Sequence, residues 1–155
     1  MTVVRYSDSD WRARIIAEAR DWITTPYQHQ ASCKGAGVDC LGLVRGIWRT
    51  VIGPEPAHCG QYSPDWAETS ESDTMIDGLG RHFVQVEHPE PGDVLAFRML
   101  ETGPAKHLAI LSTELTQEPT PMFIHAYSGL AVCEARLSMP WLRRVVAAFR
   151  FPNPE

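Results

Sequence analysis

The chain has 155 residues, a length that is usual for one domain and sufficient for a hydrophobic core. Apolar residues make up 44% and charged residues 21%, which is ordinary for a soluble globular protein. The net charge of −5 lacks the basic excess that is typical of proteins that bind nucleic acid or anionic membrane surfaces. No repeat or linker is visible, so residues 1–155 are expected to form a single domain.

The N-terminal residues contain no apolar signal-peptide core, and no stretch approaches the length of a membrane span. We therefore expect synthesis in a reducing cytoplasm and no membrane insertion. Four cysteines, Cys33, Cys40, Cys59 and Cys133, lack CxxC spacing, so disulfides and a zinc site are not expected. His58 beside Cys59 is the weak alternative for a metal, and the prediction is that no metal or organic cofactor is needed.

The predicted helices lie in the first half of the chain. After the capping residues Ser9 and Asp10, apolar residues follow helical spacing for about four turns until Thr25-Pro26. Residues 28–37 read as a loop. A second helix is predicted to begin at Asp39 and to end at Gly53-Pro54. A third, weaker helix pattern starts at Ser63-Pro64-Asp65 and carries Trp66, Met75, Ile76 and Leu79.

The remainder of the chain is predicted to form strands. The turn signals Pro91-Gly92 and Ser128-Gly129 separate apolar runs, and Trp141 lies in a short helical turn. The predicted strands are 82–86, 93–98, 107–111, 122–127, 130–136 and 145–151. Helices followed by strands indicate an α+β fold with an antiparallel sheet.

Cys40 follows directly after Asp39 and so falls in the first turn of the second helix. The unpaired N–H groups there stabilise a nearby anion by about 0.3–1 kcal/mol. Together with an imidazolium they can lower a thiol pKa from about 8.5 to about 3.5–7.5, and they could hold an oxyanion. Cys40 is thus suited to nucleophilic attack. The alternative is a buried cysteine that acts as a small hydrophobic residue.

Two histidines lie in otherwise apolar strands. His107 begins the run HLAIL, and His125 lies in FIHAY on the face shared with Phe123 and Tyr127. Buried histidines need polar partners, so on neighbouring strands one ring could hydrogen-bond the other. One imidazole could then accept the cysteine proton while the second orients it. For each histidine alone, a satisfied core residue remains the alternative.

Four motifs over residues 25–127 resemble the NlpC/P60 family of cysteine peptidases. In chain order they are Thr25-Pro26-Tyr27 with GAGVDCLGLV at 35–44, PGDVLAF at 91–97, HLAIL at 107–111, and Ile124-His125-Ala126. The resemblance implies a papain-like α+β fold in which N-terminal helices pack on a central antiparallel sheet. It also implies a thiol endopeptidase that hydrolyses peptidoglycan stem peptides, commonly between γ-D-glutamate and diaminopimelate.

Carried over to this chain, the resemblance implies Cys40 as nucleophile, His107 as base and His125 as the orienting residue. It further implies that Tyr27 borders the active site and that Asp39 lies beside the pocket for the free amine of the stem peptide. For Tyr27 the alternative is a turn residue that packs on the first helix. For Asp39 it is helix capping, and both roles could coexist.

Some features depart from the family pattern. Leu41 stands where many members carry serine, and Gln28-His29-Gln30 replaces a glycine-rich stretch, which leaves the pocket shape open. Residues 53–89 are longer than in compact members. The segment from Tyr62 to Glu68 resembles the branch of the family found in phage tails and gene transfer agents.

This branch implies a protein that is carried in a phage-like particle tail, binds tail or baseplate proteins, and opens the periplasmic cell wall during DNA delivery. The alternatives are a cytoplasmic wall-peptide recycling amidase, a structural tail or hub protein with a vestigial site, or amidase or acyltransferase chemistry on the same fold. Thiol-specific labelling of Cys40 at mildly acidic pH should distinguish a paired thiolate from a structural cysteine.

Overall fold

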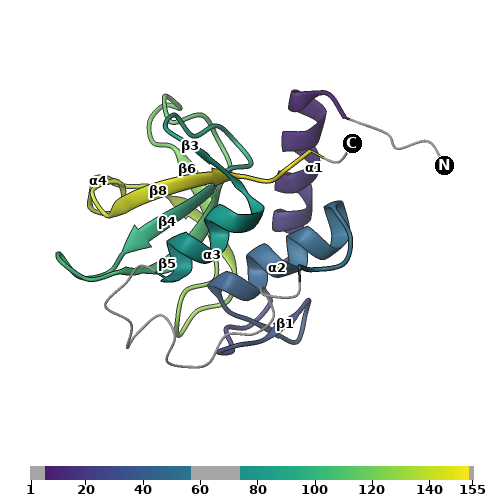
Figure 1. Ribbon diagram of the computed structural model, residues 1–155. Helices are drawn as coiled ribbons and strands as arrows, with labels where there is room; N and C mark the ends of the chain where they lie inside the picture. Colours follow the sequence, from purple (N-terminus) through teal and green to yellow (C-terminus); the bar gives the residue numbers. More distant parts are fainter. Residues whose placement is uncertain (1–5, 57–73, 154–155) are drawn as a thin grey trace.

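The computed structural model describes residues 6–56 and 74–153 (Figure 1). Helices come first and strands after them, as predicted. The elements are α1 (Asp8–Asp21), β1 (Ser32–Cys33), β2 (Gly37–Val38), α2 (Cys40–Val51), α3 (Thr74–His82), β3 (Val84–Val86), β4 (Val94–Arg98), β5 (Ala105–Leu111), β6 (Met122–His125), β7 (Cys133–Arg136), α4 (Met139–Leu142) and β8 (Val145–Arg150).

The main sheet has the strand order β3-β8-β4-β5-β6-β7, and every neighbouring pair is antiparallel. The two strands that carry the histidines, β5 and β6, are direct neighbours, with Ile110 opposite Ile124 and Leu111 opposite Phe123. The predicted antiparallel sheet is therefore confirmed, and the condition for a contact between His107 and His125 is met.

The observed N-caps of α1 and α2 can be compared with those predicted from the sequence. The side chain of Ser7 caps α1 by accepting a hydrogen bond from the N–H of Asp10 at 3.2 Å. The prediction that Ser9 and Asp10 cap this helix was wrong: the cap lies two residues before Ser9, and both Ser and Asp are suitable cap residues at any of these positions. The predicted start of α2 is confirmed: Asp39 is its N-cap and accepts from the N–H of Gly42 at 2.7 Å.

Other boundaries differ from the prediction. His82 is the last residue of α3, so the strand that was expected to begin there begins at Val84. Within the predicted loop 28–37, β1 and β2 form a hairpin whose two-residue strands are too short to show a periodic pattern. The expected helix start at Ser63-Pro64-Asp65, the branch segment 62–68 and the pair His58-Cys59 lie outside the described residues.

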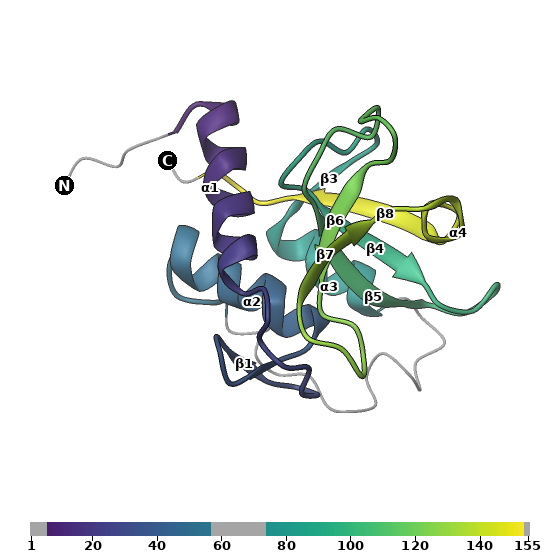
Figure 2. The same ribbon diagram turned by 180° about the vertical axis from the view of Figure 1, so that it is seen from behind.

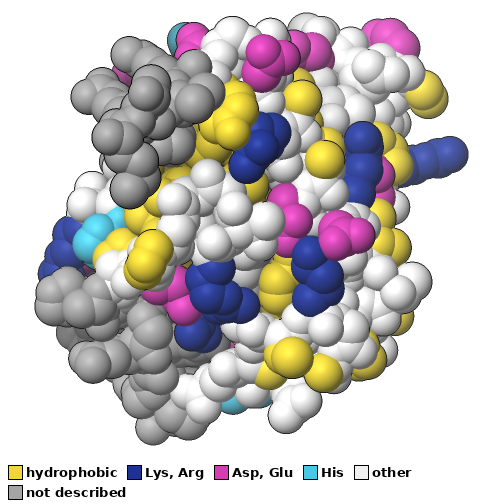
Figure 3. All heavy atoms as spheres, turned by 90° about the vertical axis from the view of Figure 1, so that its right-hand side faces the viewer, with side chains coloured by type: hydrophobic (Ala, Val, Ile, Leu, Met, Phe, Trp, Pro, Cys, Tyr) yellow, Lys and Arg dark blue, Asp and Glu magenta, His cyan; other side chains and the backbone are white. Residues whose placement is uncertain are grey.

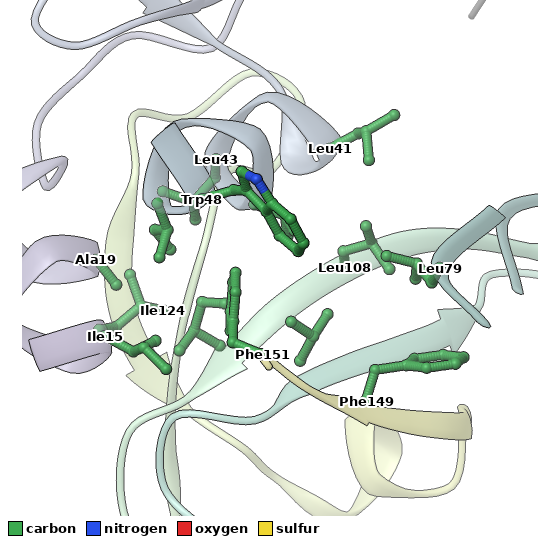
Figure 4. Close-up of a cluster of buried hydrophobic side chains, with 14 of the residues drawn as sticks. Ile15, Ala19, Leu41, Leu43, Trp48, Leu79, Leu108, Ile124, Phe149 and Phe151 are labelled. Carbon is green, nitrogen blue, oxygen red and sulfur yellow. The ribbon is translucent and has the colours of Figure 1, made fainter. Parts of the chain in front are cut away.

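Helices α1, α2 and α3 pack on one face of the sheet, whereas α4 lies on the opposite side of the molecule from α1 (Figures 1 and 2). Figure 4 shows the side chains that fill the space between helices and sheet. A second cluster covers the other face of the strands and includes Leu95, Phe97, Leu111 and Phe123, with Trp141 and Leu142 of α4 against it.

The side of α1 and α2 that faces the viewer in Figure 3 carries basic and acidic side chains close together, with no large area of one sign. Lys34 bridges Glu18 and Asp21 at 2.7 Å each. Arg45 pairs with Glu55. Over residues 6–56 and 74–153, none of the helices has both the length and the apolar character needed to cross a membrane.

Candidate active site

Cys40 is the first residue of α2, and its sulfur lies against the backbone of β5. The thiol is 3.9 Å from the carbonyl oxygen of Lys106, to which it can donate. The backbone N–H groups of Leu108, of Leu41 and of Cys40 itself lower the pKa of this thiol. The sulfur thus contacts the backbone on both sides of His107, and it lies at the positive end of α2 as predicted.

His107 and His125 form a direct hydrogen bond. Nε2 of His107 lies 2.9 Å from Nδ1 of His125, and the two residues are only 5% and 4% exposed. One of the two nitrogens must carry the hydrogen and the other must accept it. The structure therefore brings together the two histidines that the sequence singled out and satisfies the buried polar atoms that join them.

Aromatic rings surround this pair. Phe123 stacks on His125 with ring centroids 4.2 Å apart, and Phe97 lies 5.7 Å from His107. Tyr127 and Trp141 each contact both imidazoles. The predicted shared face of Phe123, His125 and Tyr127 is confirmed.

Sequence reasoning did not identify Phe97 and Trp141 as neighbours of the histidines. Phe97 pairs directly with His107 across β4 and β5, so knowledge of the strand register would have found it. Trp141 lies in a four-residue helix distant in sequence from both histidines, and no local pattern connects it to them.

Burial controls the protonation of these groups. Burial, followed by the charge of Asp39, raises the pKa of the Cys40 thiol to about 12 despite the opposing backbone N–H groups. Burial lowers the pKa of His107 to about 3, with a further contribution from His125, whose own pKa burial lowers to about 4. At neutral pH the free protein therefore holds a thiol and two neutral imidazoles.

The predicted lowering of the thiol pKa is thus wrong for this state. The helix N-terminus and the backbone N–H of Leu108 do favour the thiolate, but removal of the sulfur from water costs more than they supply. Because a thiol that stays neutral reacts slowly whatever its role, labelling at mildly acidic pH does not distinguish a nucleophile from a structural cysteine here.

Asp39 holds the preceding loop against α2. One carboxylate oxygen accepts from the N–H of Gly42 and the other from the N–H of Gln30 at 2.6 Å. The imidazole of His29 lies 3.8 Å from the second oxygen. The capping interpretation of Asp39 is confirmed, and a role in binding a substrate amine stays a prediction.

Tyr27 lies beside the chain that leads into the nucleophile helix. It forms an isolated parallel bridge with Val38, supported by hydrogen bonds from the N–H of Val38 to Pro26 and from the N–H of Gln28 to Val38. The half-buried Tyr27 packs against the hydrophobic cluster that lies between the helices and the sheet (the helix-side cluster), and Cys40 packs against the same cluster. The structure places Tyr27 beside Val38, two residues before Cys40. Its place at the border of the active site and its contact with substrate stay predictions.

Over residues 6–56 and 74–153, no set of three or more His, Cys, Asp or Glu side chains is arranged to hold a metal ion. The described site combines the Cys40 thiol, which lies against the backbone of β5, with the two linked imidazoles of His107 and His125.

No protein-family model matches the chain, and no curated protein sequence matches it. Its structure is similar to that of the NlpC/P60 domain of the peptidoglycan hydrolase SagA, with a TM-score of 0.57 and 23% identity over 90% of this chain and 98% of that one. An NlpC/P60 family protein from Bacillus cereus ATCC 10987 matches with a TM-score of 0.62 and 19% identity over 96% of this chain. NlpC2 from Trichomonas vaginalis matches with a TM-score of 0.62 and 18% identity over 97% of this chain.

The likeness to these structures shows that the chain has the papain-like α+β fold of NlpC/P60 domains. The chain spans nearly all of the SagA domain but only 41% of the Bacillus protein and 48% of the Trichomonas protein. The latter two proteins thus have more than half of their length outside the region that corresponds to this fold.

Proposed function

We propose that residues 1–155 act as one peptidase domain that hydrolyses peptidoglycan stem peptides, with Cys40 as nucleophile, His107 as general base and His125 as the residue that orients it. The observation that carries this proposal is the buried hydrogen bond between His125 on β6 and His107 on β5, the strand whose backbone contacts the Cys40 sulfur. The fold is that of SagA, which is a peptidoglycan hydrolase.

The histidine pair defines which nitrogen does the chemistry. Nε2 of His107 is engaged with His125, which leaves Nδ1 as the ring nitrogen that can accept the Cys40 proton. This requires the tautomer in which Nε2 of His107 donates to Nδ1 of His125. His125 then accepts a hydrogen bond from the imidazolium that forms during the reaction and keeps its ring in place.

The reaction proceeds by acyl transfer. As substrate binds, the thiol proton moves to His107 and the sulfur attacks the amide carbonyl to give a tetrahedral oxyanion. The C–N bond breaks, His107 protonates the leaving amine, and a thioester remains on Cys40. Water, deprotonated by His107, then hydrolyses the thioester and restores the thiol.

The first turn of α2 supplies stabilisation for the oxyanion. The N–H groups of Cys40 and Leu41 lie at the sulfur, next to the position that a carbonyl oxygen would occupy during attack. Since the thiol is neutral before substrate binds, these dipoles act mainly on the negative charge that develops in the transition state.

The proposed bond is the one between γ-D-glutamate and diaminopimelate, with the free amine of the stem peptide near Asp39 and Tyr27. Asp39 carries a buried negative charge next to the nucleophile helix, which favours a cationic amine nearby. Tyr27 lies along the same segment through its bridge to Val38 and would form a wall of the subsite.

The test is mass spectrometry of purified muropeptides after incubation with the wild-type chain and with Cys40→Ala. We expect a product split between D-glutamate and diaminopimelate from the wild type only. Cys33→Ala, which removes an exposed thiol, is the matched control and should cleave normally. If folded wild type leaves muropeptides and a panel of amide and ester substrates intact, the proposal fails in favour of a structural protein with a vestigial site.

For its biological role we propose that the protein is carried in a phage-like tail, where it contacts tail or baseplate proteins and opens the cell wall for DNA delivery. The support is the sequence of the segment from Tyr62 to Glu68, which resembles that branch. Purified particles should contain the chain at constant stoichiometry. Recovery only from particle-free cytosol would support the recycling amidase instead.

A further inference from the structure

Trp141 is in contact with both active-site histidines and with the three aromatic rings that surround them (together, the histidine cluster). Its ring centroid lies 5.5 Å from those of both His107 and His125. It also lies 5.3 Å from Phe97, 5.4 Å from Phe123 and 5.7 Å from Tyr127. The indole thus joins residues from β4, β5 and β6, although it comes from the separate helix α4.

The exposure of these rings shows which side of the cluster Trp141 occupies. Phe97 and Phe123 are fully buried, whereas Trp141 and Tyr127 remain partly exposed. The two phenylalanines therefore form the inner wall around the histidines, and Trp141 with Tyr127 forms the outer wall. Among the described residues, these two partly exposed rings cover the hydrogen-bonded pair on that side.

We propose that Trp141 is a positioning residue that closes the outer side of the His107–His125 pair, excludes water from it and holds the two rings in hydrogen-bonding orientation. This inference rests on the proposed function, because the two histidines matter to catalysis only if Cys40 is the nucleophile. Helix α4 supplies none of the three proposed catalytic residues. Its proposed role is to support the general base through Trp141.

The electrostatics of the pair agree with this role. Burial is the first cause of the lowered pKa of both histidines. Among the described residues, the other titratable groups near the pair are Cys40 from α2, Cys133 opposite His125 on β7, and Tyr127. Arg144 lies further out, with its guanidinium 6.0 Å from the Trp141 ring centroid. These are thiols, a phenol and a cation, so admission of water should raise both histidine pKa values.

The experiment is ¹⁵N NMR of the histidine rings in the full chain, comparing the wild type with Trp141→Ala and Trp141→Phe. In the wild type we expect one fixed tautomer per ring and no protonation at mildly acidic pH. In Trp141→Ala the pKa values should rise by about one unit or more, and the ring signals should move towards a tautomer mixture. Trp141→Phe, which keeps a ring, should give an intermediate shift.

Two controls separate positioning from general destabilisation. Leu142→Ala removes the adjacent α4 side chain that packs on the same cluster and should leave both pKa values unchanged. Arg144→Ala removes the cation beside the indole and should shift them by less than the loss of the ring. If Trp141→Phe and Trp141→Ala fold but keep wild-type tautomers and pKa values, the inference is overturned. If Trp141→Ala does not fold, the Phe variant decides alone.

Activity gives a second readout. In Trp141→Ala, kcat on the muropeptide should fall about tenfold or more with little change in KM, because the base and not substrate binding is disturbed. If the wild type is inactive but the Trp141 variants show the expected histidine shifts, the proposed function is refuted and the role of Trp141 in holding the histidines stands. If the wild type is active but the Trp141 variants show no histidine shifts, the role of Trp141 is refuted and the proposed function stands.

Discussion

The two faces of the main sheet carry hydrophobic clusters of different chemistry. Under α1, α2 and α3 the helix-side cluster is mostly aliphatic, with tryptophans and phenylalanines but no histidine among its buried residues, and its strand residues include Leu108, Ile110 and Ile124. On the opposite face Phe97 and Phe123 meet Trp141 and enclose two histidines. Because side chains alternate along a strand, His107 and Leu108 serve different clusters although they are adjacent in sequence.

The difference separates two tasks. The helix-side cluster packs α2 on β5 and so brings the Cys40 sulfur to the strand backbone beside His107. On the other face, Phe97, Phe123 and Trp141 (the aromatic cluster) surround the two imidazoles, which hydrogen-bond to each other and are buried from water. We therefore expect changes to the helix-side cluster to affect stability, and changes to the aromatic cluster to affect the protonation and orientation of the histidines.

Acid should produce the largest effect and should act through the aromatic cluster. The folded-state pKa values of His107 and His125 are about 3 and about 4, against an ordinary value of 6.5. Below 6.5 the unfolded chain binds protons that the folded chain cannot, so stability is full above that pH and is lost as the pH falls towards 4 and 3. The loss should be on the order of 5 kcal/mol, measured by urea unfolding between about pH 7 and about pH 4.

The controls for this prediction are two glutamine variants. His125→Gln should remove a large part of the pH dependence, because one of the two buried imidazoles is gone. His88→Gln changes an exposed histidine and should leave the wild-type dependence intact. If the free energy of unfolding depends on pH equally in all three proteins, the acid sensitivity comes from carboxylates and not from the two buried histidines.

Truncation in each cluster should separate stability from activity. Ile47→Ala leaves a cavity in the fully buried helix-side cluster and should lower the free energy of unfolding by about 3 kcal/mol, with normal cleavage per folded molecule. Phe123→Leu removes the ring stacked on His125 and should cost only about 1–2 kcal/mol, yet reduce kcat about tenfold or more. Similar kcat losses for both would mean that the clusters are not functionally distinct.

The same division explains what the sequence could and could not predict. Apolar periodicity and the Asp39 cap located α2 and placed Cys40 in its first turn, because these are local properties. The pairing of His107 with His125 was predicted only on the condition that their strands are neighbours. The contact of Trp141 with both was not predicted, since it depends on where α4 packs after a turn distant in sequence.

The protonation of Cys40 was the main error, and its largest cause, burial, is tertiary. A helix N-terminus favours a thiolate locally, and this contribution is present. The burial of the sulfur against β5 and the neighbouring charge of Asp39 together outweigh it. Neither the depth of burial nor its balance against nearby charges can be read from the residues that flank a cysteine.

A smaller effect is expected where α2 closely approaches the loop before it. A Cβ on Gly42 would overlap the carbonyl oxygen of Ala31 and lie 3.0 Å from the Asp39 carboxylate. Gly42→Ala should therefore lower the free energy of unfolding by about 2 kcal/mol in urea. Gly80→Ala on α3, with open space around it, is the control and should raise stability by about 0.5 kcal/mol. A stable Gly42→Ala would mean that the loop can move freely from Asp39.

The smallest effect is expected at an ion pair that joins helix α1 to strand β7 at the edge of the sheet. Arg20 on α1 forms a bidentate salt bridge with Glu134 on β7, in which each of the two hydrogen bonds is 3.1 Å long. The pair raises the pKa of Arg20 and lowers that of Glu134, but Arg20 is half exposed and screened by solvent. Arg20→Ala should cost about 1 kcal/mol or less, and the difference from wild type should shrink in high salt. A loss as large as that of Ile47→Ala would show that charge, and not the helix-side cluster, holds α1 on the sheet.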